Sequence, residues 1–425
     1  MRRRVVLSGC GVVTAAGNEL ASFWNALSAG TCWIKPLTGF AHAELGALQG
    51  AEVQLPLEDR LPAAIDAGTY RSRCLELALA AARRALADSK LAAGAAREGI
   101  GVVFGTTMGE ERQIGDLHDP HPDRRDAAGA REAPGACDAP AAMHAASHLD
   151  AGFYTRVNNH QLAAQVARAA GLGGPAFVTT TACSSGNASI VQAYDLVASG
   201  EADAMLAGGA DTFTRLIYCG FQRMGALSPG ICRPFDKSRD GVSFGEGAGA
   251  VLLEPLEAAQ RRGAPIYAEL AGYGISNDAH HITAPGPHGE GFVRAIHQAL
   301  DSSRTSLDEI DYVSAHGTGT VYNDRGESEA MQTVFGARAK QVPISSIKSM
   351  IGHTNGAAAT IEAVACALAI QHGAVPPTAR LQEPDPDFDL DYVPNVGRPH
   401  PVRTCLSLAA GFGGHNVCIV LKKVA

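Results

Sequence analysis

Several features common to other functional classes are missing from this sequence. Its ten cysteines include no CxxC pair, which argues against a zinc site and against a dithiol redox motif. No dense stripe of Lys and Arg is present and the net charge is −8, so nucleic acid is not an expected partner. No uncharged apolar run of about 18 residues occurs, so no membrane span is expected.

The N-terminal residues also lack the pattern of a secretory signal peptide. Residues 1–4 are basic, but the apolar stretch 5–13 is followed by Thr, Ala and Gly instead of a longer apolar region. This pattern predicts a first strand. Together with the scattered cysteines, it predicts a reducing, cytoplasmic location.

What the sequence does contain is material for a large buried core. Of its 425 residues, 46% are hydrophobic and 18% are charged, which is typical of a well-buried globular enzyme. Single cores usually stop growing at roughly 250–300 residues, so two core-forming halves are expected.

Short apolar runs alternate with longer segments of helical periodicity, which predicts a layered α/β fold. The first strand is expected at 5–8, ending in a turn at Gly9, Cys10 and Gly11. The other predicted strands are 99–105, 177–181, 204–207, 249–253, 268–275, 312–315, 343–347, 405–409 and 417–421. The predicted helices are 75–86, 184–198, 292–302, 326–335 and 357–370.

The strand–glycine openings at 5–11 and 270–274 are similar in kind, which suggests two related halves that meet near residue 260. We therefore expect domains at 1–260 and 261–425. Segment 116–151 is rich in Pro, His and charge and has little periodicity, so it is interpreted as a cap or a mobile loop of the first half. Its histidines match no ligand spacing, and no metal is expected there.

Cys183 lies between a β-branched strand end, Thr179 to Thr181, and a helix of very small residues. This places the thiol at a helix N-terminus, where the helix dipole and free N–H groups favour a thiolate nucleophile. The alternative is a buried structural cysteine.

Two histidines also follow predicted strands. His316 opens a turn with Gly317, Thr318, Gly319 and Thr320, and His353 ends segment 346–353 ahead of a long helix. A single histidine is commonly a structural group. Two histidines at parallel strand ends, together with Cys183, predict an active site assembled by the fold.

The stretch 410–416 is a glycine-rich turn between two β-rich runs. Its backbone N–H groups could point into a site and form an oxyanion hole, or the turn could simply close a hairpin. It is not a phosphate loop, because the GxxxxGK[ST] and GxGxxG spacings are absent.

These four segments resemble the β-ketoacyl synthase (condensing enzyme) family, and the resemblance extends over about the whole chain. Segments 235–241, 245–249 and 276–279 also resemble family segments, in the expected order. The resemblance implies a thiolase-like, five-layered αβαβα fold made of two similar halves. It also implies a decarboxylative Claisen condensation of malonyl-acyl carrier protein with an acyl chain held on the enzyme. No bound cofactor is implied, since phosphopantetheine arrives on the acyl carrier protein.

Catalytic roles follow from the same resemblance. Cys183 resembles the nucleophile that takes the acyl chain, and His316 and His353 resemble the pair that promotes decarboxylation. Lys348 resembles the lysine that holds the His353 region, with Glu362 as its ion-pair partner.

Substrate-binding roles are implied for a second group. Thr318 and Thr320 resemble the hydroxyls that bind the phosphopantetheine arm. Phe412 resembles the gating phenylalanine, whose N–H with that of Cys183 would form the thioester oxyanion hole. Met108 and Glu110 fall where the acyl pocket of the family is lined.

Several rival interpretations exist. The pair of histidines argues against initiating ketosynthases and chalcone-synthase relatives, which pair His with Asn. Thiolases need a second cysteine, but Cys405 and Cys418 lie in no thiolase-like turn. A chain-length factor would lack the nucleophile, and an idle carrier-binding subunit would not need the full catalytic set.

The pathway is the more open question. His415 stands where Thr is usual in the family's GFGGTN turn, and the run from His316 to Asp324 also favours a type II polyketide or aryl polyene pathway over housekeeping fatty-acid elongation. The expected partners are an acyl carrier protein and either a second copy or a chain-length-factor-like subunit. Arg71 and Arg73 lie near the family's basic docking patch.

Overall fold

The computed structural model describes residues 3–38, 48–56, 59, 72–91, 97–109 and 158–424. Predictions about Glu110, Arg71 and segment 116–151 lie outside these residues. Within them, no helix combines the length and the apolar composition needed to cross a membrane.

Ten strands form the main sheet, five from each half of the chain. The first-half strands are β1 (Val5–Val13), β4 (Ile100–Gly105), β5 (Ala176–Thr179), β6 (Ala204–Asp211) and β8 (Gly247–Pro255). The second-half strands are β9 (Ala268–Asn277), β10 (Tyr312–Ser314), β11 (Ile344–Ser345), β14 (Thr404–Gly411) and β15 (His415–Lys422).

The strand order reads β11-β10-β14-β15-β9-β1-β8-β6-β4-β5, so the halves meet where β9 pairs with β1. Outward from that seam, each half repeats the same pattern. In the first half β1–β8 and β8–β6 are antiparallel, and β6–β4 and β4–β5 are parallel. In the second half β9–β15 and β15–β14 are antiparallel, and β14–β10 and β10–β11 are parallel. This repeated topology is the structural counterpart of the similar openings in the sequence.

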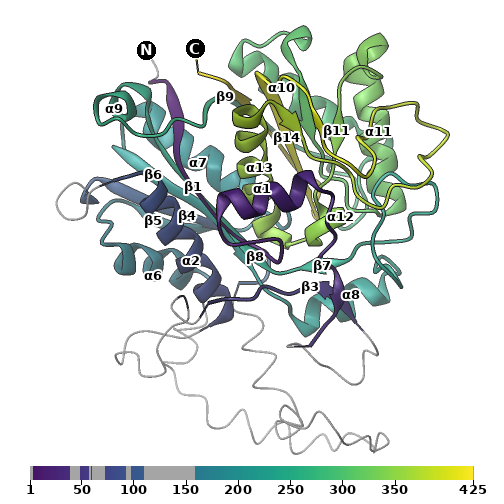
Figure 1. Ribbon diagram of the computed structural model, residues 1–425, viewed down its shortest axis with the longest axis horizontal. Coiled ribbons are helices and arrows are strands. Elements are labelled where there is room, and N and C mark those ends of the chain that lie inside the picture. Colours follow the sequence, from purple (N-terminus) through teal and green to yellow (C-terminus); the bar gives the residue numbers. More distant parts are fainter. Residues whose placement is uncertain are drawn as a thin grey trace, which may run out of the picture.

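Helices cover both halves and fill the space between them (Figure 1). The principal helices are α2 (Arg73–Asp88), α6 (His160–Ala170), α7 (Ser185–Ser199), α10 (Glu290–Ser303), α11 (Val321–Phe335) and α13 (Ala358–His372). Helix α7 packs on β4 and β6, and α13 packs on β8, β14 and α7, so this pair lies between the half-sheets. Helices α2 and α6 cover the first half, and α10 and α11 cover the second, which gives the expected five layers.

Smaller elements complete the described part. The remaining α-helices are α1 (Leu20–Ser28), α8 (Arg215–Arg223), α9 (Leu256–Arg261) and α12 (Lys348–Ile351). Two small sheets contain β2 (Lys35–Pro36), β3 (Gln49–Ala51), β7 (Phe244–Gly245), β12 (Ala374–Val375) and β13 (Arg398–Pro399). Helices α1, α6 and α8 were not expected from the sequence. They are only 9 to 11 residues long, so their periodicity is brief.

The turn expected at Gly9–Gly11 is wrong, because β1 continues through it to Val13. These glycines allow a close approach of helix α2. A Cβ on Gly9 would lie 2.3 Å from the carbonyl oxygen of Ala85, and one on Gly11 would lie 2.2 Å from that of Ala81. The glycines therefore reflect helix–sheet packing instead of chain reversal.

Candidate active site

Cys183 lies in a tight bend between β5 and α7, as the sequence predicts. The residue before it, Ala182, has a φ of +52°, which is a left-handed conformation that alanine rarely adopts. The Ser185 hydroxyl braces the bend. It accepts a hydrogen bond from the Thr181 N–H at 2.8 Å and donates to the Ala182 carbonyl at 2.5 Å. Backbone strain is thus held in place directly beside the thiol.

The protonation state of Cys183 differs from the sequence-based expectation. The thiol is buried, and this burial raises its pKa to about 12, while the nearby Lys348 ammonium only partly counteracts the rise. Desolvation of the charged form therefore outweighs the helix N-terminus, and the resting side chain is a neutral thiol. The proton must leave during the reaction and not before it.

The two histidines come together although 37 residues separate them in the chain. Their ring centroids are 5.5 Å apart, and the rings meet nearly edge to face at 87°. His316 follows the end of β10, and His353 follows the short helix α12. The backbone of His353 is tied to β7, because its N–H donates to Ser243 at 2.7 Å and its carbonyl accepts from Gly245 at 3.1 Å.

Both imidazoles are held neutral by their surroundings. Burial lowers the pKa of each ring well below its usual value, and the positive charge of Lys348 lowers both further. The Nδ1 atoms of His316 and His353 are buried and have no hydrogen-bond partner among the described residues. A neutral ring carries one N–H donor. Each histidine can therefore donate one hydrogen bond to a developing oxyanion.

Lys348 and Glu362 form an ion pair that is almost completely buried, with side-chain exposures of 1% and 2%. Burial raises the pKa of Glu362 to about 7, although the Lys348 ammonium acts in the opposite direction. The pairing expected from the family resemblance is therefore present in the structure, with Lys348 on α12 and Glu362 on α13.

Glu327, in α11, is a supporting residue that the sequence did not single out. Its fully buried carboxylate accepts hydrogen bonds from the N–H groups of His316, at 2.7 Å, and Gly317, at 2.8 Å. Burial raises its pKa to about 7. The available signal was an acidic residue near the start of the helix expected at 326–335, 11 positions after His316. Such residues are common on solvated helix faces.

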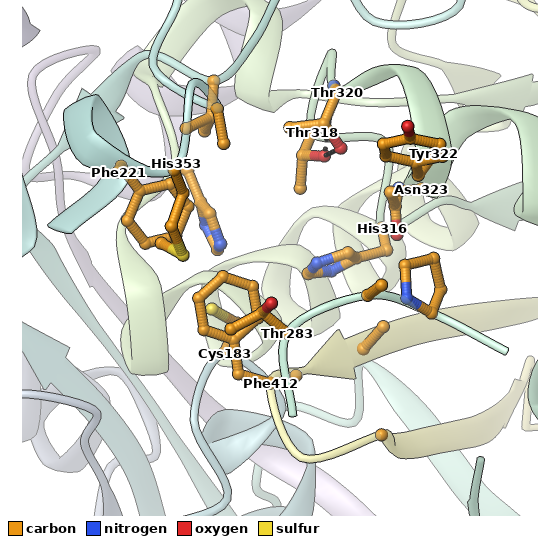
Figure 2. Close-up of a pocket in the computed structure, with 18 of the residues that line it drawn as sticks. Cys183, Phe221, Thr283, His316, Thr318, Thr320, Tyr322, Asn323, His353 and Phe412 are labelled. Atoms are coloured by element: carbon orange, nitrogen blue, oxygen red, sulfur yellow. Dashed lines mark hydrogen bonds between the residues drawn. The ribbon is translucent and has the colours of Figure 1, made fainter. Parts of the chain in front are cut away.

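One cavity of about 230 Å³ brings together the predicted nucleophile, both histidines, both threonines and Phe412, whereas Lys348 and Glu362 lie outside its lining. Figure 2 shows the thiol of Cys183 and the rings of His316 and His353 pointing into it. Thr318 and Thr320 also line the cavity, across from Cys183, and their hydroxyl groups are 2.9 Å apart. The described part of the protein contains no cluster of His, Cys, Asp or Glu suited to a metal ion.

Phe412 covers the cysteine side of the cavity (Figure 2). Its ring stacks on Phe221 with a centroid distance of 5.2 Å and an angle of 11°. Phe412 lies in the turn between β14 and β15, next to Gly411. A Cβ on Gly411 would lie 3.2 Å from the Cys183 backbone nitrogen, so this turn approaches the nucleophile closely.

Two other predicted residues are placed differently. Met108 does not line the cavity. It packs instead against the buried cluster that contains Phe213, Tyr218 and Phe244, which Phe221 also contacts. Arg73 is not a free docking cation, because its guanidinium donates to the Glu246 carboxylate at 2.7 Å.

Comparison with known proteins agrees with this geometry. Residues 2–259 match the β-ketoacyl synthase N-terminal domain, and residues 267–382 match the C-terminal domain of the same family. The chain is 38% identical to the tetracenomycin polyketide synthase ketoacyl synthase alpha subunit of Streptomyces glaucescens, over 99% of this chain and 97% of that protein. It is also 38% identical to 3-oxoacyl-[acyl-carrier-protein] synthase 2 of Synechocystis, over 99% and 98%.

Solved structures share the whole fold. The ishigamide ketosynthase/chain length factor superposes with a TM-score of 0.86 at 37% identity, covering all of both chains. A type II polyketide ketosynthase solved with its acyl-carrier protein gives a TM-score of 0.85 at 31% identity, again over both full chains. The chain belongs to the β-ketoacyl synthase family, with its thiolase-like fold, and is an acyltransferase that carries out the β-ketoacyl synthase condensation.

Proposed function

We propose that Cys183 carries the growing acyl chain and that His316 and His353 promote decarboxylation of a malonyl unit bound beside it. The observation that carries this proposal is the convergence of the three side chains on one cavity. The proposed partner is an acyl carrier protein, whose phosphopantetheine arm would enter along the Thr318 and Thr320 hydroxyls.

In the first step, the Cys183 sulfur attacks the thioester carbonyl of the incoming acyl group. The bond from that carbonyl to the pantetheine sulfur breaks, and the cysteine proton passes to the departing sulfur. Because Cys183 rests as a neutral thiol, this transfer accompanies the attack. The N–H groups of Cys183 and Phe412 are the proposed donors to the transient oxyanion.

In the second step, the malonyl thioester loses carbon dioxide and becomes an enolate. The neutral rings of His316 and His353 donate hydrogen bonds to the enolate oxygen. The enolate carbon then attacks the acyl–Cys183 carbonyl, which forms the new carbon–carbon bond and expels the cysteine sulfur. The released thiolate takes up one proton from solvent, which balances the negative charge that the malonyl carboxylate brought in, and the product leaves as a β-ketoacyl thioester.

Lys348 and Glu362 are proposed to position the His353 region and not to react themselves. Helix α12 begins at Lys348, and His353 follows this helix directly. A positive charge fixed at that point also keeps both imidazoles neutral. Removal of the charge would therefore alter the position of the pair and remove one of the causes of its lowered pKa values.

For the pathway, we propose a type II polyketide or aryl polyene system. His415 in the glycine-rich turn supports this, as does the run that follows His316, in which Asn323 lines the cavity. Housekeeping fatty-acid elongation is the second candidate, because the Synechocystis synthase is as similar as the polyketide subunit. We also propose a dimer. Its second subunit is an identical copy or a chain-length-factor-like subunit.

Two measurements test the proposal. Release of carbon dioxide from malonyl carrier protein would separate an enzyme from an idle carrier-binding subunit, and no release would contradict the proposed chemistry. Mass spectrometry of Cys183 after exposure to a panel of acyl carrier-protein thioesters would test the pathway. Preferential loading of saturated long chains would favour fatty-acid elongation instead.

A further inference from the structure

A buried carboxylate outside the predicted catalytic set is hydrogen-bonded both to the loop after β4 and to the turn that follows His353. Asp211 is the last residue of β6, and none of its surface is exposed. Its two oxygens accept five hydrogen bonds within 3.2 Å. The donors are the Thr106 hydroxyl and the N–H groups of Thr107, Met108, Gly109 and Gly356.

The geometry fits an ionised carboxylate. The Thr106 hydroxyl accepts from the Gly109 N–H at 2.8 Å, so its own proton is free to donate to Asp211, also at 2.8 Å. The other four partners are backbone N–H groups, which can only donate. Burial raises the pKa of Asp211, and the donated hydrogen bonds act against that rise.

One set of contacts leads from Asp211 to the nucleophile. The single proton of the Ser185 hydroxyl is shared between the Ala182 carbonyl at 2.5 Å and the Thr106 carbonyl at 3.2 Å. The same hydroxyl braces the bend before Cys183 through its bonds with Thr181 and Ala182. Two hydrogen-bonded residues, Thr106 and Ser185, therefore separate the Asp211 carboxylate from the strained bend.

A second set leads to the histidines. Gly356 donates its N–H to Asp211 at 2.7 Å and lies three residues after His353. Between them, Asn355 has a φ of +52°, so this short link is held in an uncommon conformation. Gly356 lies in the 3₁₀ turn Asn355–Ala357, which runs directly into α13, and a helix N-terminus favours a negative partner.

We propose that Asp211 is a positioning residue that fixes the Cys183 bend and the His353 loop relative to each other. The proposal rests on the roles assigned above to Cys183 and His353. The carboxylate acts as one acceptor shared by two segments that come from different halves of the chain. Condensation needs the Cys183 bend and the His353 loop in the correct relative position. Acylation of Cys183 needs only the Cys183 bend.

Asp211→Asn tests this, because the amide has the same shape but can accept at only one of the two oxygen positions. We expect condensation to fall on the order of 10²-fold, since a displacement of about 1 Å at reacting groups has that effect. The rate of Cys183 acylation should stay within roughly threefold of wild type. This rate is expressed per active site, and the active sites are counted by iodoacetamide labelling of Cys183. A proportional fall in both reactions would overturn the proposal, and so would an unchanged rate of condensation.

The pH dependence of alkylation separates positioning from general loosening. The negative charge of Asp211 contributes to the raised pKa of Cys183, so Asp211→Asn should move the alkylation midpoint to lower pH. Thr106→Val is the matched control, since it removes one donor and leaves the charge. An equal shift in both variants would mean that altered packing, and not the Asp211 charge, controls the thiol, which would overturn that part of the proposal.

Thr106→Val also tests the positioning role if the Asp211 variant does not fold. It should lower condensation by several-fold more than it lowers acylation, and equal or absent losses would overturn the proposal. Wild-type protein is the reference throughout. If wild type itself does not condense, the proposed function fails, whereas condensation unaffected by either variant contradicts only the role of Asp211.

Discussion

The two halves of the molecule share one strand pattern, yet their equivalent strand ends carry different side chains. In the first half, β5 leads through a strained bend to Cys183 and then to α7. In the second half, the equivalent strand β11 leads to Lys348 and His353 and then to α13. The duplicated scaffold therefore brings a nucleophile and its proposed hydrogen-bond donors to a common centre from opposite sides.

The halves also hold the neighbouring loops in a similar way. The loop after β4 donates four hydrogen bonds to Asp211, and the loop after β10 donates two to Glu327. In both cases a buried carboxylate fixes backbone N–H groups close to the reacting side chains. The two halves differ in the side chains that they bring to the cavity, which are a thiol in the first half and imidazoles in the second. Variants that remove one group at a time should therefore affect different steps of the reaction.

The largest expected effect comes from removing the nucleophile. Cys183→Ala should abolish acyl transfer and condensation, because none of the other cysteines in the described residues lines the cavity. Malonyl decarboxylation should persist, since that step uses the histidines of the other half. Acyl groups from carrier-protein thioesters should load onto Cys183 and onto none of the other nine cysteines, and peptide mass spectrometry would identify the site. Condensation by Cys183→Ala would disprove its assignment as nucleophile.

The reciprocal experiment removes the donors of the second half. His316→Ala and His353→Ala should each lower the decarboxylation rate on the order of 10²–10³-fold, as for the loss of other oxyanion donors. Acylation of Cys183 should continue in His353→Ala. Carbon dioxide release and intact-protein mass spectrometry measure the two reactions separately. A wild-type rate of decarboxylation in the His316→Ala, His353→Ala double variant would contradict the proposed role of the two histidines.

Lys348→Ala should resemble a weaker His353 variant and should also destabilise the fold. Loss of one partner leaves the buried carboxylate of Glu362 without its counter-charge, which typically costs roughly 3–5 kcal/mol. Denaturant unfolding would measure this cost. Lys348→Met with Glu362→Leu is the control, because it removes both charges and should recover stability without recovering decarboxylation.

A smaller effect is expected behind the cavity. Met108→Phe adds volume next to the cluster of Phe213, Tyr218 and Phe244, and overpacking costs roughly 1–3 kcal/mol. Displacement of Phe221 towards the cavity should weaken acceptance of long acyl chains by about 5–150-fold. Malonyl decarboxylation should barely change. Chain-length profiles measured by loading of Cys183 would test this, and a profile identical to wild type would refute it.

The smallest effect concerns pH. An unperturbed imidazole with a pKa of about 6.5 would be about nine-tenths charged at pH 5.5. The lowered pKa values of His316 and His353 move that charging well below pH 6.5, so the two imidazoles should add no pH dependence to decarboxylation of bound malonyl thioester from pH 7.5 to 5.5. A tenfold fall over this range would show either that one ring titrates normally or that protonation of Glu327 or Glu362, whose pKa values are about 7, displaces the pair.

Stability over the same range should reflect opposing contributions. His316 and His353 bind protons more weakly when folded, so they make the fold less stable as pH falls below about 6.5. Glu327 and Glu362, whose folded pKa values are about 7, bind protons more strongly when folded and make it more stable as pH falls from about 7 towards 4.5. Unfolding measurements at pH 5.5 and 7.5 should therefore differ little, which keeps the rate comparison valid.

Much of the fold could be predicted because its strands and helices carry clear local patterns. The strand β4 and the first part of β6, at 204–207, are continuous apolar runs, and the long helices have distinct lengths. Gly9 and Gly11 were misread, because a glycine needed for a close helix contact looks the same in sequence as one in a turn. The location of Met108 behind the cavity likewise depends on packing partners that are distant in the chain.

The sequence by itself determined the alternation of strands and helices, and it indicated Cys183, His316 and His353 as the proposed reacting side chains. Local periodicity and residue chemistry are properties of neighbouring residues, so they can be read from one chain. Tertiary structure decided the protonation states, because burial raises the pKa of the Cys183 thiol and lowers those of the histidines. It also decided the roles of Asp211 and Glu327. Asp211 meets the Gly356 N–H only when the two halves fold together, and Glu327 meets the His316 N–H only when α11 packs on the loop after β10.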